Sequence, residues 1–140
     1  MDDHTFENFN VKCTFLIPPI LYGNREVERV FGCTYGLYPI PNIFFLYIAS
    51  IFLELKYKVE YIDSPVVKLK KNDFYTRLKN NKSDIYLFYT VNLAKKTDLS
   101  AAGYIKTIFP EAWFIFMGPS PTSEAADYLV CNLSIVIRGE

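Results

Sequence analysis

Short apolar runs alternate along the chain with segments whose apolar residues recur at helical spacing. The runs predict five β-strands, over residues 11–19, 57–63, 84–90, 113–118 and 134–139. The first run, VKCTFLIPP, is almost continuously apolar, which is typical of a strand covered on both faces of a parallel sheet. The second run, YKVEYID, alternates apolar and charged residues and is therefore predicted at the edge of the sheet.

The two helices expected in the first half of the chain differ in character. Asn42 is suited to cap a helix over residues 43–56. The apolar positions of this helix go most of the way round its axis, so we expect it to be buried on more than one face. A short, weak helix is predicted over residues 73–81, where Phe74 and Leu78 share one face.

Two further helices are expected in the second half. One begins near Thr97 or Asp98 and is ended by Pro110. The other follows the fourth strand, with Ser120 or Thr122 as its cap. The residues predicted to form its inner stripe are Ala126, Leu129 and Val130.

Strands separated by helices predict right-handed crossovers and a parallel sheet. The fold class expected is therefore α/β, a flavodoxin-like (Rossmann-type) doubly wound five-stranded parallel sheet with helices on both faces. Residues 1–10 read as a polar N-terminal tail, and residues 11–140 as one domain. Ligands of such sheets bind outside the carboxyl ends of the strands, which here means the loops 18–42, 90–97 and 118–122.

Composition narrows the partners of this domain. The 140 residues carry 15 basic and 15 acidic side chains, so no net charge draws the domain to nucleic acid or to an anionic membrane. The most apolar stretch, residues 43–55, is shorter than the roughly 18–20 residues that span a bilayer. The acidic start, MDDHTFENFN, is unlike a signal peptide, and a cytoplasmic location is expected.

Several kinds of chemistry find no support in the residues. His4 is the single histidine and is interpreted as a solvated residue of the tail. The three cysteines, Cys13, Cys33 and Cys131, match neither a disulfide framework nor a zinc cluster. The chain has no G-x-G-x-x-G and no Walker loop, and the ends of the first and third strands lack the carboxylates of a phosphate-receiver domain. No catalytic residue is therefore assigned.

The long loop after the first strand carries two arginines, Arg25 and Arg29. Both could meet an anionic group, but two solvated arginines are the preferred interpretation.

Several segments together resemble a known family. They are FLIPP, LYIASIFLELKYKVEYID, DIYLFYT, AAGYIKTIFPEAWFIFMGPSPT and SIVIRGE. In this order and spacing they look like the cobalamin-binding domain at the amino terminus of radical S-adenosylmethionine enzymes. That family has Pro-Pro after the first strand, a Gly-Gly-Pro loop after the fourth and Arg-Gly-Glu after the fifth. The resemblance spans roughly residues 11–140.

The resemblance implies a cofactor and a larger enzyme. Cobalamin would bind without a histidine ligand, because PPILYG stands where other cobalamin proteins place the histidine loop. A C-terminal radical S-adenosylmethionine barrel in the same polypeptide would hold a [4Fe–4S] cluster through C-x-x-x-C-x-x-C. That barrel would bind S-adenosylmethionine and carry out methyl transfer or another radical modification. The end at Glu140 is then expected to be a domain boundary.

The resemblance also implies which residues surround the nucleotide tail of cobalamin. They are Thr90, Val91, Asn92, Gly118, Pro119, Ser120 and Thr122. The chain departs from the family pattern at two places, with Leu87, Phe88 and Tyr89 in place of Gly-x-Ser, and Met117 in place of the first glycine. Larger side chains at these positions predict a narrower slot, because packed interiors absorb extra volume at about 1–3 kcal/mol.

Two other interpretations remain open. The domain could have lost its cofactor and serve as a docking module for the barrel, a substrate or a partner chain. The apolar excess of helix 43–56, with Phe44, Phe45 and Tyr47, favours this alternative and would also allow self-association. The other interpretation is an unrelated flavodoxin-like module.

Overall fold

A parallel sheet of five strands forms the centre of the molecule. The computed structural model describes residues 10–24, 26–29 and 40–139. The strands are β1 (Lys12–Ile17), β2 (Lys58–Asp63), β3 (Ile85–Tyr89), β4 (Trp113–Met117) and β5 (Ser134–Val136). They lie in the order β2-β1-β3-β4-β5, and every neighbouring pair is parallel. The predicted flavodoxin-like fold class is confirmed, and β2 is an edge strand as its alternation predicts.

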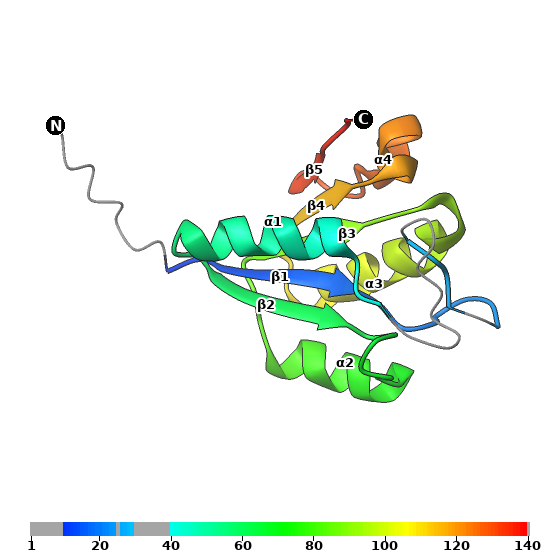
Figure 1. The fold of residues 1–140 in the computed structure, drawn as a ribbon, viewed down its shortest axis with the longest axis horizontal. Helices are drawn as coiled ribbons and strands as arrows, with labels where there is room; N and C mark the ends of the chain where they lie inside the picture. The colour runs from blue at the N-terminus through cyan, green and yellow to red at the C-terminus, as the bar shows by residue number, and fades with distance from the viewer. Residues whose placement is uncertain (1–9, 25, 30–39, 140) are drawn as a thin grey trace, which may run out of the picture.

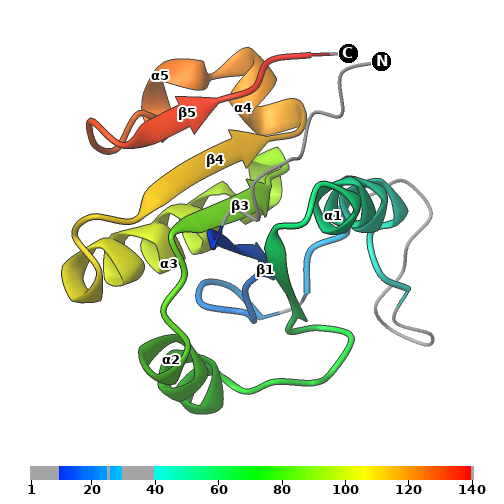
Figure 2. The same ribbon diagram turned by 90° about the vertical axis from the view of Figure 1, so that its left-hand side faces the viewer.

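Helices cover both faces of the sheet (Figure 1). The helical elements are α1 (Ile43–Glu54), α2 (Lys71–Asn80), η1 (Asn92–Ala94), α3 (Lys95–Ile108), α4 (Pro119–Ser123) and α5 (Ala125–Tyr128). Figure 2 shows α1 alone on one side of the sheet, with α2 and α3 on the other. This arrangement follows from the strand order, because the crossover from β1 to β2 runs opposite to the later ones.

The face of the sheet under α2 and α3 is covered by a large aromatic core. Phe74 and Leu78 of α2 are both buried, so the predicted apolar side of this helix is confirmed. Phe88 and Phe116 stack across β3 and β4 with ring centroids 5.1 Å apart, and Phe116 also contacts the ring of Tyr128. The core thereby joins α2, the sheet and α5.

The other face packs against α1. The predicted cap is confirmed, since the Asn42 side chain accepts a hydrogen bond from the backbone N–H of Phe45 (3.1 Å). Phe45 is buried and lies edge-on to Phe15 of β1, with ring centroids 5.0 Å apart. Phe44 and Tyr47 are 58% and 68% exposed, however. The expectation that this helix is buried on more than one face is therefore wrong for the described residues.

The segment after β4 also differs from its prediction. Instead of one helix, two short helices meet at Glu124, whose φ of −127° and ψ of 47° interrupt the helical path. Gly118, rather than Ser120 or Thr122, occupies the N-cap position of α4. Leu129 and Val130, predicted for an inner stripe, are exposed, and Tyr128 is the residue that enters the core.

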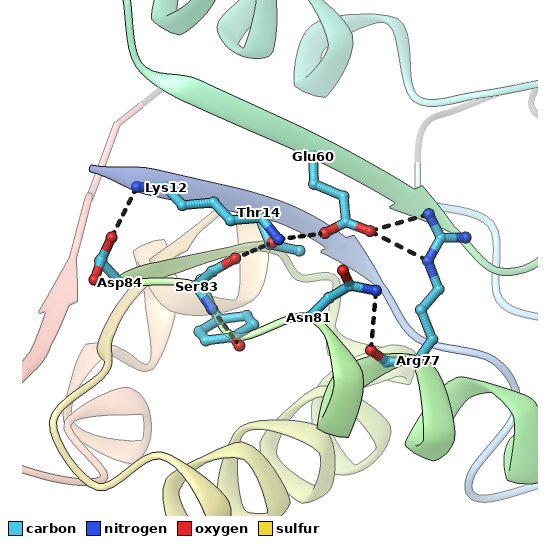
Figure 3. A network of polar contacts seen from close by, with 8 residues as sticks. Lys12, Thr14, Glu60, Arg77, Asn81, Ser83 and Asp84 are labelled. Carbon is cyan, nitrogen blue, oxygen red and sulfur yellow. Dashed lines mark hydrogen bonds and ion pairs between the residues drawn. The ribbon is translucent and has the colours of Figure 1, made fainter. Parts of the chain in front are cut away.

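A polar network ties β1 and β2 to α2 and the start of β3 (Figure 3). The hydroxyl oxygens of Thr14 and Ser83 lie 2.6 Å apart in the interior. Glu60 of β2 forms ion pairs with Lys12 (3.1 Å) and Arg77 (3.0 Å). The network links β1, β2 and the segment before β3 to α2.

Among the described residues, no helix is long and apolar enough to cross a bilayer. The predicted polar tail lies outside the described residues except for Asn10.

Candidate ligand-binding site

The carboxyl ends of all five strands meet at one edge of the sheet, since the strands are parallel. The loops at 18–42, 90–97 and 118–122 leave from this edge. From β1 the strand order extends to β2 on one side and to β3, β4 and β5 on the other. In doubly wound sheets, ligands usually bind at such a reversal of strand order, which here is the crevice between β1 and β3. A second place for a ligand lies between α1 and the turn after β4.

Protein groups fill the crevice between β1 and β3. The guanidinium of Arg29 donates to both carboxylate oxygens of Asp98, at 2.5 and 2.7 Å. It also donates to the carbonyl oxygen of Tyr89 (2.8 Å), while Thr90 Oγ1 donates to Asp98 Oδ2 (2.7 Å). The side chains of Arg29 and Asp98 are 4% and 0% exposed. The interpretation of Arg29 as solvated is therefore wrong, and Arg25 lies outside the described residues.

Little space remains above this ion pair. The cavity beside Arg29, lined also by Pro18, Pro19 and Thr97, measures about 10 Å³. A single water molecule needs roughly 10–15 Å³ of such space. The switch point of the sheet is thus closed by the loop that follows β1.

The turn after β4 approaches the end of β3 very closely. Gly118 has φ +108° and ψ −175°, a conformation that is essentially restricted to glycine. A Cβ at this position would lie 2.7 Å from the carbonyl oxygen of Thr90. The Thr90 backbone accepts from the Ser120 N–H (3.2 Å) and donates to the Met117 carbonyl (2.8 Å). Gly118 is therefore required by a backbone-to-backbone contact.

The two hydroxyls of this turn have separate roles. Ser120 is buried, and its Oγ accepts a hydrogen bond from the Tyr128 hydroxyl (2.6 Å). Thr122 Oγ1 donates to the Gly118 carbonyl (2.8 Å) and lies 3.2 Å from the carbonyl oxygen of Gly139. Ser120 thus holds α5 against the turn, and Thr122 holds the segment that follows β5.

An open hollow lies on the α1 side of this turn. Its volume is about 590 Å³. Its lining residues are Ile48, Tyr89, Met117, Gly118, Pro119, Thr122, Ile137 and Gly139. Four of them carry large apolar or aromatic side chains, while Thr122 and the glycine backbones supply the polar groups. Burial raises the pKa of the Tyr89 phenol on this wall above its ordinary value.

The seven predicted site residues are not brought together as one set. Gly118, Pro119 and Thr122 line the hollow. Thr90 and Ser120 are buried beneath it in hydrogen bonds to the protein. Val91 and Asn92 lie at the start of η1 and are not among its lining residues.

Metal-binding side chains do not cluster in the part of the chain that the structure describes. No cluster of three or more His, Cys, Asp or Glu that could hold a metal ion occurs among those residues. Burial, with a smaller contribution from Asp84, raises the pKa of Cys13 to about 11. A buried thiol of that kind is a poor nucleophile at neutral pH.

Sequence reasoning missed the partnership of Arg29 and Asp98. The pattern predicts only a helix start at Asp98, yet Asp98 precedes the buried Ala101 and Ala102 by three and four residues. That spacing places a carboxylate on the inner face of α3, where it requires a cation or hydrogen-bond donors. The spacing was the available signal for a buried ion pair.

Searches of protein-family models, of curated proteins and of solved structures find no match for this chain.

Proposed function

We propose that this chain is a cobalamin-binding-type domain of a radical S-adenosylmethionine enzyme and that the hollow beside Met117 receives the nucleotide tail of the cofactor. One observation carries the proposal: the carboxyl edge holds an open hollow of about 590 Å³ between α1 and the turn after β4. The family resemblance implies a tail bound between the sheet and its helices at this edge. Bound cobalamin would supply a methyl carrier to a separate barrel domain.

The residues around the hollow fit the tail, a flat aromatic base joined to a ribose and a phosphate. Pockets for small ligands typically span about 300–1,000 Å³ and have apolar walls with a few polar groups. Ile48, Tyr89, Met117 and Ile137 would hold the aromatic base. Thr122 and the backbone at Gly118 lie where the polar ribose could be bound.

The departures from the family pattern affect this hollow unequally. Met117 and Tyr89 line it directly, so their extra volume narrows the space. Leu87 is 1% exposed and packs within the core under α1. Truncating Leu87 would therefore open a core cavity. Truncating Tyr89 or Met117 would widen the hollow, and for Met117, which is 7% exposed and belongs to the same core, it would also remove buried packing.

The test is to mix the protein with hydroxocobalamin, remove free ligand by gel filtration and record the visible spectrum. Corrin absorbance should elute with the protein. Met117→Gly combined with Tyr89→Ser should increase the bound fraction, because it removes side-chain volume from the hollow. A double variant that stays folded and binds no more than the original chain would contradict the steric explanation.

A matched pair of tryptophan variants locates the binding. Ile137 lines the hollow. Ile135, two residues earlier, is also exposed but is not among the lining residues. Ile137→Trp should abolish co-elution, and Ile135→Trp should preserve it. Equal binding by both variants would place the cofactor elsewhere.

A second candidate is a domain that binds no cofactor and docks onto another protein part. The exposed apolar residues of α1, including Ile43, Phe44 and Tyr47, favour it. A folded protein that elutes without corrin absorbance, in both the original chain and the widened double variant, would support this candidate over the first.

A further inference from the structure

The N-terminus of α2 borders a second hollow, separate from the one beside Met117. Its volume is about 400 Å³. Its lining residues are Pro19, Ile20, Glu26, Ser64, Pro65, Lys68, Leu69, Lys70 and Lys71. No residue is shared between the two hollows. The second one lies beyond the carboxyl ends of β1 and β2, where the loops after these strands meet α2.

Three lysines surround the positive end of a helix. Lys70 occupies the N-cap position of α2 and forms no capping hydrogen bond, and Lys71 is the first helical residue. Within the described residues, none of Lys68, Lys70 and Lys71 forms a salt bridge. Cations are unfavourable at a helix N-terminus, because the first backbone N–H groups already present positive charge there. A bound anion would offset the positive charge of the lysines and that of the backbone N–H groups.

A buried hydroxyl provides an independent indication of a ligand. Ser64 lines the hollow and is 1% exposed, and its Oγ has no hydrogen-bond partner among the described residues. The backbone of Ser64 is fully used, since its N–H donates to the Ile17 carbonyl (3.0 Å) and its carbonyl accepts from Leu69 (2.9 Å). The side chain is therefore held in place with an unused donor, and a buried polar group in that state is destabilising unless a ligand binds it.

Two carboxyl groups near the hollow determine how much negative charge it can take. Glu26 also lines the hollow, and its pKa is raised by burial and to a smaller extent by Asp63, against the opposing effects of Arg29 and the Ile20 backbone. Asp63 precedes Ser64, and burial raises its pKa as well. Among the residues that line the hollow, three lysines stand against Glu26 alone, so the lining itself carries a positive balance of charge, with Asp63 and Asp73 adjacent to it in the chain.

We propose that this hollow binds the phosphate group of a small soluble ligand, held by the Ser64 hydroxyl, the lysines Lys68, Lys70 and Lys71, and the first backbone N–H groups of α2. Helix N-termini bind phosphate through these same N–H groups. The proposal does not depend on cobalamin, because the site uses other residues than the hollow beside Met117.

The test is a titration of the ¹⁵N-labelled chain with inorganic phosphate and with pyrophosphate, at constant ionic strength and followed by NMR. The backbone amides of Lys71 and Asn72 should shift and saturate. Lys70→Gln and Ser64→Ala should each weaken the apparent affinity roughly fivefold, about the effect of one lost hydrogen bond. Lys79→Gln, on the last turn of the same helix, should change it less than about twofold.

Urea unfolding without phosphate separates binding from folding. Without phosphate, Ser64→Ala should unfold at a midpoint no lower than that of the original chain, because it removes a buried hydroxyl that bonds no described residue. It should lose only the stabilisation by added phosphate. If Lys70→Gln and Lys79→Gln weaken phosphate binding equally, the binding reflects general charge attraction, and the proposed site is wrong. Shifts that do not saturate at tens of millimolar phosphate would overturn it as well.

Discussion

Two places at the carboxyl edge of the sheet differ sharply in how they are filled. Above β1 and β3, where doubly wound sheets usually bind ligands, the Arg29–Asp98 ion pair leaves about 10 Å³. Beside β4, on the α1 side, the walls enclose about 590 Å³. The first place is charged and closed, whereas the second is mainly apolar and open.

The difference shows that a fold class alone does not locate the site. Strand order marks the crevice beside β1 as the natural ligand position. The long loop after β1 supplies a guanidinium that occupies this position and donates to Asp98 of α3 and to the Tyr89 carbonyl at the end of β3. The Thr90 hydroxyl donates to the same Asp98 carboxylate. The proposed cofactor site therefore lies on the face covered by α1, where the close contact at Gly118 borders the hollow without filling it.

Removing the Asp98 carboxylate from the crevice between β1 and β3 should cause the largest loss of stability. Asp98→Ala removes the carboxylate that balances the buried Arg29 guanidinium, and the free energy of unfolding should fall by about 3–5 kcal/mol. Urea denaturation followed by circular dichroism measures this loss. The double variant Arg29→Met, Asp98→Leu removes both charges and should recover most of the stability. A loss below about 1 kcal/mol in the single variant would show that water reaches the pair and that the crevice is open.

The contact at Gly118 separates the two places and should be the next most sensitive position. Gly118→Ala places a Cβ 2.7 Å from the Thr90 carbonyl oxygen at φ +108°. Strain and overpacking together predict a loss of roughly 2–4 kcal/mol in unfolding free energy. Gly103, in α3, has open space around it, and Gly103→Ala should stabilise the protein by up to about 1 kcal/mol. Thermal unfolding that shifts equally in both variants would contradict the backbone contact.

Elements with local, repeated patterns were predictable from the sequence. The alternation in β2 indicated an edge strand, and the spacing of Phe74 and Leu78 indicated the buried side of α2. Asn42 was identifiable as a cap because the interaction reaches only three residues along the chain. Each of these features depends on residues close in sequence, and their spacing follows the two-residue period of a strand or the 3.6-residue period of a helix.

Features that depend on distant segments were not predictable in the same way. Arg29 and Asp98 are separated by 69 residues, and the sequence alone does not show which loop residue meets which helix. The break at Glu124 turned Leu129 and Val130 outward, because two helices of five and four residues replaced one longer helix. The hollow beside Met117 combines α1, β3, β4 and the segment after β5, so its volume emerged only from their packing.

Substitutions at the hollow beside Met117 should change the free energy of unfolding least. Ile137 lines the hollow and is 49% exposed, so Ile137→Ser removes little buried surface and should lower the free energy of unfolding by about 1 kcal/mol or less. Its backbone N–H donates to the Phe116 carbonyl (2.9 Å), a bond that the substitution leaves in place. Phe116→Ala, in the covered core, should lose about 3–5 kcal/mol in the same urea experiment. Comparable losses in the two variants would mean that the hollow is closed in solution, and the contrast between the two places would then disappear.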